Sequence, residues 1–432
     1  MRTLSPESGA GLDSAIGMRD LLPPESRARR NISNQIQGVF ESYGYELVTT
    51  PLVEKVETFE RGPLFDRRDL LRFVEPDSGE VIALRTDMTP QVARVVCTRL
   101  SAYPPPFRIR YEGTVIRRRR GRARRQRQIA QVGVELIGMA APHADAEVVQ
   151  LCAEACHAVG LADFRIELAE VGVARALLKA ENPHLVESVQ EAFARKDEAL
   201  LMTQLKAAGV GADERRRLTS LLHLHGSLDV LAEAEKALKG TAAEPHLRAL
   251  REVTRRLEGA GLAQRLGVDL GEIRGEAYYT GVSFALFARG PGEAVASGGR
   301  YDDLLGRYGA AAPATGAAID IENLLRALDA AERPWRASGP ARALVTGDFE
   351  NASDYANALR KAGLAAAVLP DASQETAMRY ARAWSRAVVI VVAAGEAKAI
   401  RVRDGATQAV HRQLSSAEAG SLQAWVRAEQ EE

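Results

Sequence analysis

The residues best suited to bind a polar ligand lie in two segments, 117–138 and 274–281. The first ends in IAQVGVELIG, whose alternation predicts a strand with Gln131, Gly133 and Glu135 on one face. An amide and a carboxylate on the inner face of an apolar strand are costly to bury without partners. The pattern favours a bound polar ligand; the alternative is a pair of side chains that satisfy each other within the core.

A free amino acid is a ligand that the residue types of these segments would suit. An arginine would bind its carboxylate, acidic and polar groups would hold its ammonium, and other hydrogen-bonding side chains would contact its own functional group. The chain offers these, in that order, as Arg274; Asp87, Thr89 and Gln131; and Glu135 with Tyr278 or Tyr279. We expect these side chains to converge on one pocket.

Eight arginines fall within residues 117–127. A run of this kind is usually a solvated loop that attracts phosphate or an acidic surface. RNA binding is one interpretation of it. However, no aromatic residue is interleaved between positions 113 and 138, so the loop itself offers no platform on which bases could stack.

Composition restricts the class of protein. The 432 residues are 46% hydrophobic and 26% charged, enough for a large core and two or three domains. Lys and Arg number 57 and so do Asp and Glu, which argues against a surface built as a whole for nucleic acid. The sequence has no apolar run of about 18 residues and no secretion-signal pattern at its start. We therefore expect a cytoplasmic protein that is not embedded in a membrane.

Nothing in the sequence predicts a metal or a cofactor. Cys152 and Cys156 stand one helical turn apart among alanines, which is typical of small core residues in a reducing cytoplasm. The glycines at 298 and 299 match no nucleotide-binding fingerprint. Arg300, which follows them, either binds an anion or pairs with Asp302 or Asp303.

The chain divides by pattern into five parts. Residues 1–16 form a loose tail, 17–182 and 261–330 an α+β domain, 183–260 a helical insertion, 331–341 a linker and 342–432 a small α/β domain. Within the α+β domain, residues 107–118 and 129–138 should pair as antiparallel strands, and 71–87 should form a hairpin. A helix should follow, with Thr89 as its N-cap and Pro90 in its first turn.

Six segments resemble, in order, the landmarks of histidyl-tRNA synthetases and of their paralogues, the regulatory subunits of ATP phosphoribosyltransferase. They are GMRDLLPPES, LRTDMTPQVAR, VIRRRRGRARRQRQIAQVGVELIG, IRGEAYYTG, SGGRYDDLLGRYG and GAAIDIENL, within residues 17 to about 330. The resemblance implies a class II aminoacyl-tRNA synthetase fold: a six- or seven-stranded antiparallel sheet flanked by helices, a helical insertion, and dimerisation through the first motif. It puts the histidine contacts of the family on Asp87, Thr89, Arg117, Gln131, Glu135, Arg274, Tyr278 and Tyr279.

Departures from the pattern distinguish the two relatives. Active synthetases have a glutamate where this chain has Arg119, and an arginine that binds the γ-phosphate where it has Asn323. Loss of such clamps argues against adenylation. Ala277 replaces the aspartate usual in both relatives. The C-terminal domain resembles a reduced anticodon-binding domain.

The resemblance therefore implies a non-catalytic, histidine-binding subunit without cofactors. Its partner would be the short catalytic form of ATP phosphoribosyltransferase, in a hetero-octamer that contains homodimers of this chain and is inhibited by histidine. The alternatives are a divergent histidyl-tRNA synthetase and an RNA-binding paralogue, although tRNA is not the partner that we expect.

Overall fold

The structure is a computed structural model, and it describes residues 14–23, 25–62, 70–117, 126–140, 142–178, 183–273, 279–332, 342–393, 396–410, 420–422 and 424–425. Its contacts divide the chain into two compact units. One comprises residues 1–20 and 32–335, and the other residues 21–31 and 336–432. The first helix, α1 (Glu25–Ser42), contributes residues to both.

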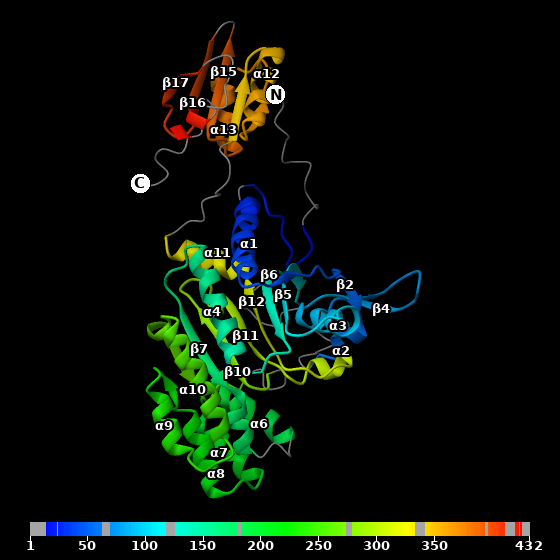
Figure 1. Cartoon of the computed structure of the whole chain (residues 1–432), viewed down its shortest axis with the longest axis vertical. Coiled ribbons are helices and arrows are strands. Elements are labelled where there is room, and N and C mark those ends of the chain that lie inside the picture. The colour runs from blue at the N-terminus through cyan, green and yellow to red at the C-terminus, as the bar shows by residue number, and fades with distance from the viewer. Residues whose placement is uncertain are drawn as a thin grey trace. The chain divides into compact units, whose positions relative to one another are not determined.

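A nine-stranded sheet forms the centre of the larger unit (Figure 1). The six central strands pair antiparallel, whereas the outer pairs β1–β5 and β7–β9 are parallel. In spatial order the strands are β1 (Glu46–Leu47), β5 (Phe107–Ile116), β6 (Gln128–Ile137), β12 (Ala314–Asp320), β11 (Ala296–Arg300), β10 (Val282–Phe287), β7 (Arg165–Glu170), β9 (Leu266–Asp269) and β8 (His225–Gly226). The antiparallel sheet is confirmed, and short edge strands extend it beyond the expected six or seven.

The predicted pairing across the arginine run is confirmed. β5 and β6 are antiparallel from Phe107 opposite Ile137 to Ile116 opposite Gln128. The expected hairpin is also present, as β3 (Arg72–Val74) and β4 (Val81–Leu84), and β2 (Val53–Lys55) joins them in a separate three-stranded sheet. The short helix α2 (Val56–Glu60) follows β2.

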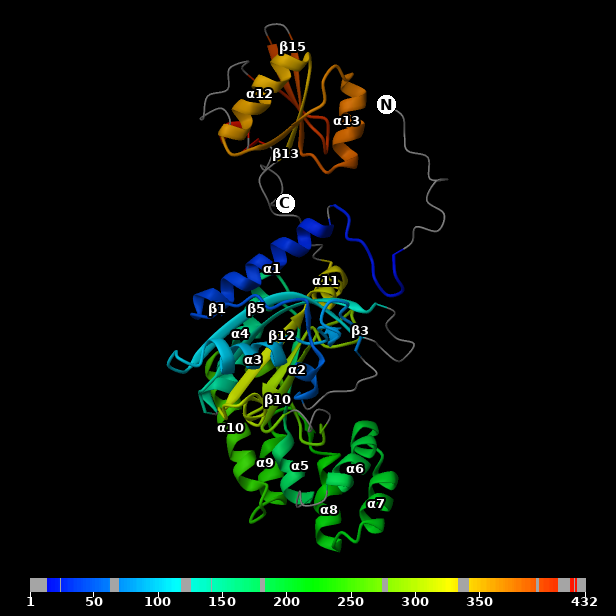
Figure 2. The same cartoon turned by 90° about the vertical axis from the view of Figure 1, so that its right-hand side faces the viewer.

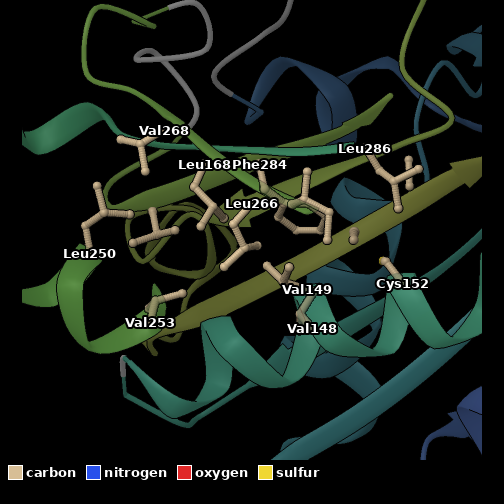
Figure 3. Packing of buried hydrophobic residues seen from close by; sticks show 14 of the residues in the cluster. Val148, Val149, Cys152, Leu168, Leu250, Val253, Leu266, Val268, Phe284 and Leu286 are labelled. Carbon is tan, nitrogen blue, oxygen red and sulfur yellow. The ribbon is translucent and has the colours of Figure 1, made fainter. Parts of the chain in front are cut away.

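One face of the large sheet is apolar and covered by helices. Val132, Val134 and Leu136 of β6 belong to the main core cluster, against which α4 (His143–Ala158) packs. Figure 3 shows Val148, Val149 and Cys152 of α4 beside Leu168, Phe284 and Leu286 of the sheet. Each such buried side chain stabilises the fold by roughly 1.5–3 kcal/mol. Burial raises the pKa of the Cys156 thiol to about 12, in keeping with a packing role.

The opposite face of the sheet carries small side chains. β5 contributes Gly113, β6 Gly133, β12 Gly316, and β11 Gly299 and Ser297, and the strand register puts all of them on one side. The helix α3 (Thr89–Arg99) packs over the β5–β6 end of this face through Val92 and Val96. Because glycine has no side chain, this face can receive a ligand.

The segment expected to be a helical insertion is helical almost throughout and lies at one end of the larger unit (Figure 2). Its helices are α6 (Pro183–Arg195), α7 (Glu198–Ala207), α8 (Ala212–Leu221), α9 (Val230–Ala237) and α10 (Glu244–Gly259), and α5 (Val171–Leu178) precedes them. His225 and Gly226 interrupt these helices as the short strand β8, which pairs antiparallel with β9. Two residues are too few for an alternating pattern to reveal.

The smaller unit has the expected α/β pattern. Its sheet runs β14 (Ala365–Val368), β13 (Arg342–Thr346), β15 (Val388–Ala393), β16 (Glu396–Arg401) and β17 (Thr407–Val410), with the first three parallel and the rest antiparallel. The helices α12 (Phe349–Lys361) and α13 (Gln374–Ala383) pack into separate core clusters, one containing Ile390 and the other Val389. Since alternate residues of a strand point to opposite faces, the two helices cover opposite sides. Of the helices in the described ranges, none is long and apolar enough to cross a bilayer.

Arg300 is held by carboxylates. Its Nη1 lies 2.8 Å from Asp302 Oδ1, and its Nη2 lies 2.8 Å from Asp145 Oδ1 on α4. The interpretation that Arg300 pairs with an acid is therefore confirmed for Asp302, and Asp145 is a second partner that the sequence did not indicate. The Arg300 and Asp145 side chains are 5% and 3% exposed, so the pair is almost fully withdrawn from water.

We predict that Asp145→Ala destabilises the fold by roughly 3–5 kcal/mol, because it leaves a buried guanidinium short of its charge partner. Glu191→Ala is the matched control, since it removes an exposed ion pair with Arg195 and should cost less than about 1 kcal/mol. Urea denaturation of both variants measures the difference. Equal losses of unfolding free energy in the two variants would show that the buried pair stabilises the fold no more than the exposed one.

Candidate ligand-binding site

Glu135 is the centre of the site. It lies on β6, facing the small-residue side of the sheet, and is 1% exposed. The Thr89 hydroxyl, at the start of α3, donates a 2.6 Å hydrogen bond to its Oε1. A Cβ atom at Gly316 would overlap Glu135 Oε2 and lie 2.5 Å from the Tyr301 hydroxyl. The carboxylate therefore occupies space that exists because position 316 has no side chain.

The protonation of Glu135 is set by its surroundings. Burial raises the pKa of this carboxyl well above its ordinary value, and the nearby Asp87 carboxylate raises it further. The hydroxyls of Thr89 and Tyr111 oppose the shift by hydrogen bonding. A cationic group of a ligand placed beside Glu135 would favour the charged carboxylate and would be bound more strongly in return.

Asp87 and Arg117 stand together at the edge of the site. Arg117 Nη2 lies 4.0 Å from Asp87 Oδ1, and both side chains are about one-third exposed, at 36% and 33%. Arg117 Nε donates to the Thr86 carbonyl at 2.8 Å, which fixes the guanidinium, and Asp87 Oδ1 accepts from the Met88 amide at 2.8 Å. The site thus presents a carboxylate and a guanidinium side by side. The first suits the ammonium group of an amino acid and the second suits its carboxylate.

Tyr279 lies on the same face of the sheet, packed against the core cluster that contains Val92 and Val96 of α3. A Cβ at Gly299 would lie 2.9 Å from its ring, so the ring lies over β11. Burial raises the pKa of the Tyr279 hydroxyl, the charges of Asp87 and Glu135 raise it further, and Arg117 opposes them. All three charged groups are therefore close enough to Tyr279 to act on it.

Gln131 supplies an unused acceptor on the same face. It is 5% exposed, two residues before Gly133 on β6, and pairs across the sheet with Gly113 and Asp320. Its Oε1 is buried and has no hydrogen-bond partner among the described residues. Leaving an amide oxygen unsatisfied costs roughly 1–3 kcal/mol, which a donor on a ligand would offset.

The structure thus brings together part of the expected set. Asp87, Thr89, Arg117, Glu135 and Tyr279 interact, and Gln131 lies on the same face. Arg274, Tyr278 and Arg119 lie outside the described residues.

One expectation about Thr89 is wrong. The helix α3 begins at Thr89, its N-cap is Met88, and no side chain caps it. The Thr89 hydroxyl donates to Glu135 Oε1, and as the first residue of the helix it is one position too late to act as the cap. Pro90 lies in the first turn as expected.

Two tyrosines near Glu135 escaped sequence reasoning. Tyr111 and Tyr301 are 0% and 2% exposed, and their hydroxyls lie close to the backbone of Gly133 and Gly316, where a Cβ atom would be 2.5 Å away. Tyr111 pairs with Gly133 in the β5–β6 register. A tyrosine opposite a glycine in two strands predicted to pair is the signal that could have revealed the first of them.

The start of α11 (Ile321–Ala330) brings no positive charge toward a phosphate. Asn323 is 2% exposed, and its Nδ2 donates to the Ala294 carbonyl at 2.8 Å. Its neighbour Glu322 accepts from the Ala130 amide at 2.8 Å. Neither side chain brings a positive charge. In the part of the chain that is described, no three His, Cys, Asp or Glu side chains are grouped as metal ligands.

A central antiparallel sheet with helices on one face and a polar pocket on the other is the arrangement of class II aminoacyl-tRNA synthetases. The family model of histidyl-tRNA synthetase matches residues 17–324. A histidyl-tRNA synthetase from a Nostoc species has the same fold, with a TM-score of 0.77 at 20% identity, over 95% of this chain and 99% of that one.

Relatives with higher identity show which branch of this family the chain belongs to. An ATP phosphoribosyltransferase regulatory subunit from Geobacter sulfurreducens is 35% identical over 421 residues, which are 94% of this chain and 96% of the relative. One from an Anaeromyxobacter species is 42% identical over 329 residues, 76% of this chain and 95% of the relative, and is therefore shorter. A solved structure from Bacillus halodurans, described as an ATP phosphoribosyltransferase regulatory subunit/histidyl-tRNA synthetase, has a TM-score of 0.78 at 27% identity over 89% of this chain and 99% of that chain. The chain belongs to the family of ATP phosphoribosyltransferase regulatory subunits.

The raised pKa of Glu135 predicts a pH dependence of stability. The folded protein holds this proton more tightly than the unfolded chain does, so the wild type loses stability as the pH rises from about 4.5 through the folded pKa. Glu135→Gln has no titrating group at this position. Its free energy of unfolding, relative to that of the wild type, should therefore rise over the same interval.

Urea denaturation from about pH 4 to about pH 8 measures the effect. The exposed Glu233→Gln is the control and should follow the wild type. If the free energies of unfolding of the wild type and Glu135→Gln changed with pH in parallel, the raised pKa of Glu135 would be contradicted.

Proposed function

We propose that this protein is a non-catalytic regulatory subunit that binds L-histidine and assembles with the short catalytic subunit of ATP phosphoribosyltransferase. The observation that carries the proposal is the buried Glu135 carboxylate, bonded to Thr89 and surrounded by the hydroxyls and charges of an amino-acid pocket. The names of relatives at 35% and 42% identity support a regulatory role and a catalytic ATP phosphoribosyltransferase subunit as the partner, and histidine biosynthesis is part of the proposal.

Histidine suits the pocket group by group. Its ammonium would approach Asp87 and the unused Oε1 of Gln131, which together provide charge and an acceptor. Its imidazole, which has two ring nitrogens, would lie between Glu135 and Tyr279. Arg117 and Arg274 would share the carboxylate. Every polar group of the ligand then has a partner of opposite character.

The proposal assigns catalysis to the partner. Synthetases clamp ATP with an arginine at the position of Asn323, and here that position carries a buried amide engaged with the backbone. Loss of one transition-state donor costs about 10²–10³ in rate. Arg119 reverses a second charge in the family pattern. Adenylation of histidine would thus lack two of its usual supports.

Feedback inhibition would follow from unequal affinity. Histidine shifts a subunit arrangement only if it binds the inhibited form more tightly than the active one, and a tenfold preference corresponds to about 1.4 kcal/mol. We propose a hetero-octamer in the cytoplasm, built on homodimers of this chain, in which tRNA is not a partner. The proposal assigns no role to the smaller unit of this chain.

We predict that L-histidine binds the isolated protein and that Asp87→Asn weakens binding at least about tenfold, because a charge-assisted hydrogen bond is lost. Asp329→Asn is the matched control, an exposed aspartate on α11, and should leave affinity unchanged. Calorimetric titration gives both constants. L-Glutamine, which has the same backbone groups without the imidazole, should not compete. Equal histidine affinity of wild type and Asp87→Asn would show that Asp87 does not contact the ligand.

We also predict that the protein co-purifies with the short phosphoribosyltransferase from its own cells and that histidine inhibits the complex. Asp87→Asn should raise the inhibitory histidine concentration by the factor by which it weakens binding, since both report the same site. Enzyme assay of the reconstituted complex, with Asp329→Asn as the control, measures this. Histidine-dependent exchange of pyrophosphate into ATP by this protein alone would favour a divergent synthetase instead.

A further inference from the structure

The segment 274–278, which contains Arg274 and Tyr278 of the expected site, is part of the connection between β9 and β10. The segment itself lies outside the described residues, but the chain on both sides of it is described. Each of these two flanks contacts a cationic side chain from the helices at the insertion end of the larger unit. The proposed recognition of histidine assigns no role to either cation.

The flank that follows the segment is held by Arg175 of α5. Its Nη2 donates a 3.1 Å hydrogen bond to the Tyr279 carbonyl. Thr280 is bonded to the sheet at the same point, since its amide donates to the Arg300 carbonyl at 2.7 Å and its hydroxyl accepts from the Asp302 amide at 2.9 Å. A backbone held in this way fixes where the Tyr279 side chain begins. The placement of the Tyr279 ring in the ligand-binding site therefore depends on α5.

The flank that precedes the segment is held by Lys196, in the turn between α6 and α7. Its Nζ lies 2.6 Å from Asp269 Oδ1, and the same oxygen accepts from the Gly271 amide at 2.9 Å. A Cβ atom at Gly271 would lie 2.7 Å from this Nζ and 2.8 Å from the Leu221 carbonyl oxygen of α8. The chain that leads to Arg274 is thus packed closely against the insertion.

The backbone of Lys196 has a conformation that favours glycine. Its φ is 52°, in the left-handed region that residues with side chains rarely adopt. It stands directly before Asp197, the residue that caps α7 by accepting from the Leu200 amide. A glycine would form this turn with less strain, so the turn itself does not require a lysine. What the lysine side chain adds is the contact with Asp269.

The two cations belong to one packed group of helices. α5 packs against α6 and α8, and α7 packs against both of these as well. Leu177 of α5, Leu201 of α7 and Leu218 of α8 are buried in the same core cluster. Figure 2 shows these helices together at one end of the larger unit. Because packed side chains carry displacements from one helix to the next, a shift of this group moves both flanks of the segment.

We propose that Arg175 and Lys196 are positioning residues for the ligand-binding site, through which the helices α5–α8 set the affinity for histidine. Neither residue is assigned a contact with the ligand, because each acts through the backbone that leads to Arg274 or carries Tyr279. This inference rests on the proposed function, since it concerns the same histidine. The coupling is reciprocal: histidine favours the placement of these helices by the factor by which that placement raises histidine affinity.

Calorimetric titration of the full-length protein with L-histidine tests the role of Arg175. Arg175→Met keeps the aliphatic stem but removes the donors, and it should weaken histidine binding about tenfold. Arg175→Lys, which retains a charge and a donor, should recover part of the loss. Arg248→Met is the matched control, because it breaks only an exposed ion pair with Glu244 on α10, and it should leave histidine affinity unchanged.

Lys196→Gly separates positioning from stability. It removes the cation but relieves the left-handed backbone, and the lost ion pair is partly exposed, at 36% and 18% for its two side chains. The urea midpoint should therefore change little, while histidine binding weakens several-fold. A variant that loses stability but binds histidine as the wild type does would show that Lys196 supports the fold alone.

Amide hydrogen exchange gives a second readout. Without ligand, the Thr280 amide should exchange faster in Arg175→Met than in the wild type or Arg248→Met, and saturating histidine should slow exchange in α5–α8 of the wild type. Equal histidine affinity of wild type, Arg175→Met and Lys196→Gly, or no slowing by histidine in these helices, would overturn the inference. If the wild type binds no histidine, the proposed function fails, and the ligand-free exchange of Thr280 still decides whether Arg175 positions this backbone.

Discussion

A carboxylate held away from water on a sheet cleared by glycines is the constraint on which the rest of this structure depends. Glu135 could not be buried on β6 without Thr89, whose hydroxyl bonds it, or without the space beside Gly316. Those two residues come from a helix start and a strand far apart in the chain. The pairing of β6 with β5 and β12, and the packing of α3 over them, must therefore form before the carboxylate has its surroundings.

The division of the sheet into two unlike faces explains why one fold can hold both a stable core and a polar pocket. Val134 and Leu136 alternate with Glu135 along β6, so burying the apolar face against α4 necessarily turns Glu135 to the other side. A one-residue slip would exchange the faces, which is why the register is strongly specified. The same alternation in β10 turns Ser283 toward the face that carries Gly299 while Phe284 enters the core.

Local periodicity made much of this predictable. The β5–β6 pair, the shared face of Gln131 and Glu135, and the small α/β unit all follow from alternation that can be counted along the chain. What was missed depends on contacts between distant residues. Thr89 was assigned to helix capping because its long-range partner is invisible in a local window, and Asp145 meets Arg300 across 155 positions. The two residues of β8 are assigned by pairing alone.

The proposed function gives the free energy of amino-acid binding a different use from the one it has in a synthetase. In a synthetase, interactions with the amino acid help to position it for attack on ATP, so they contribute to a transition state. In this chain Asn323 is engaged with the backbone and brings no charge to a phosphate. In the proposed function, histidine bound at Glu135 and Asp87 would have no chemical step to accelerate. Its binding free energy would be available to stabilise one arrangement of subunits over another, which is the requirement for a regulatory site.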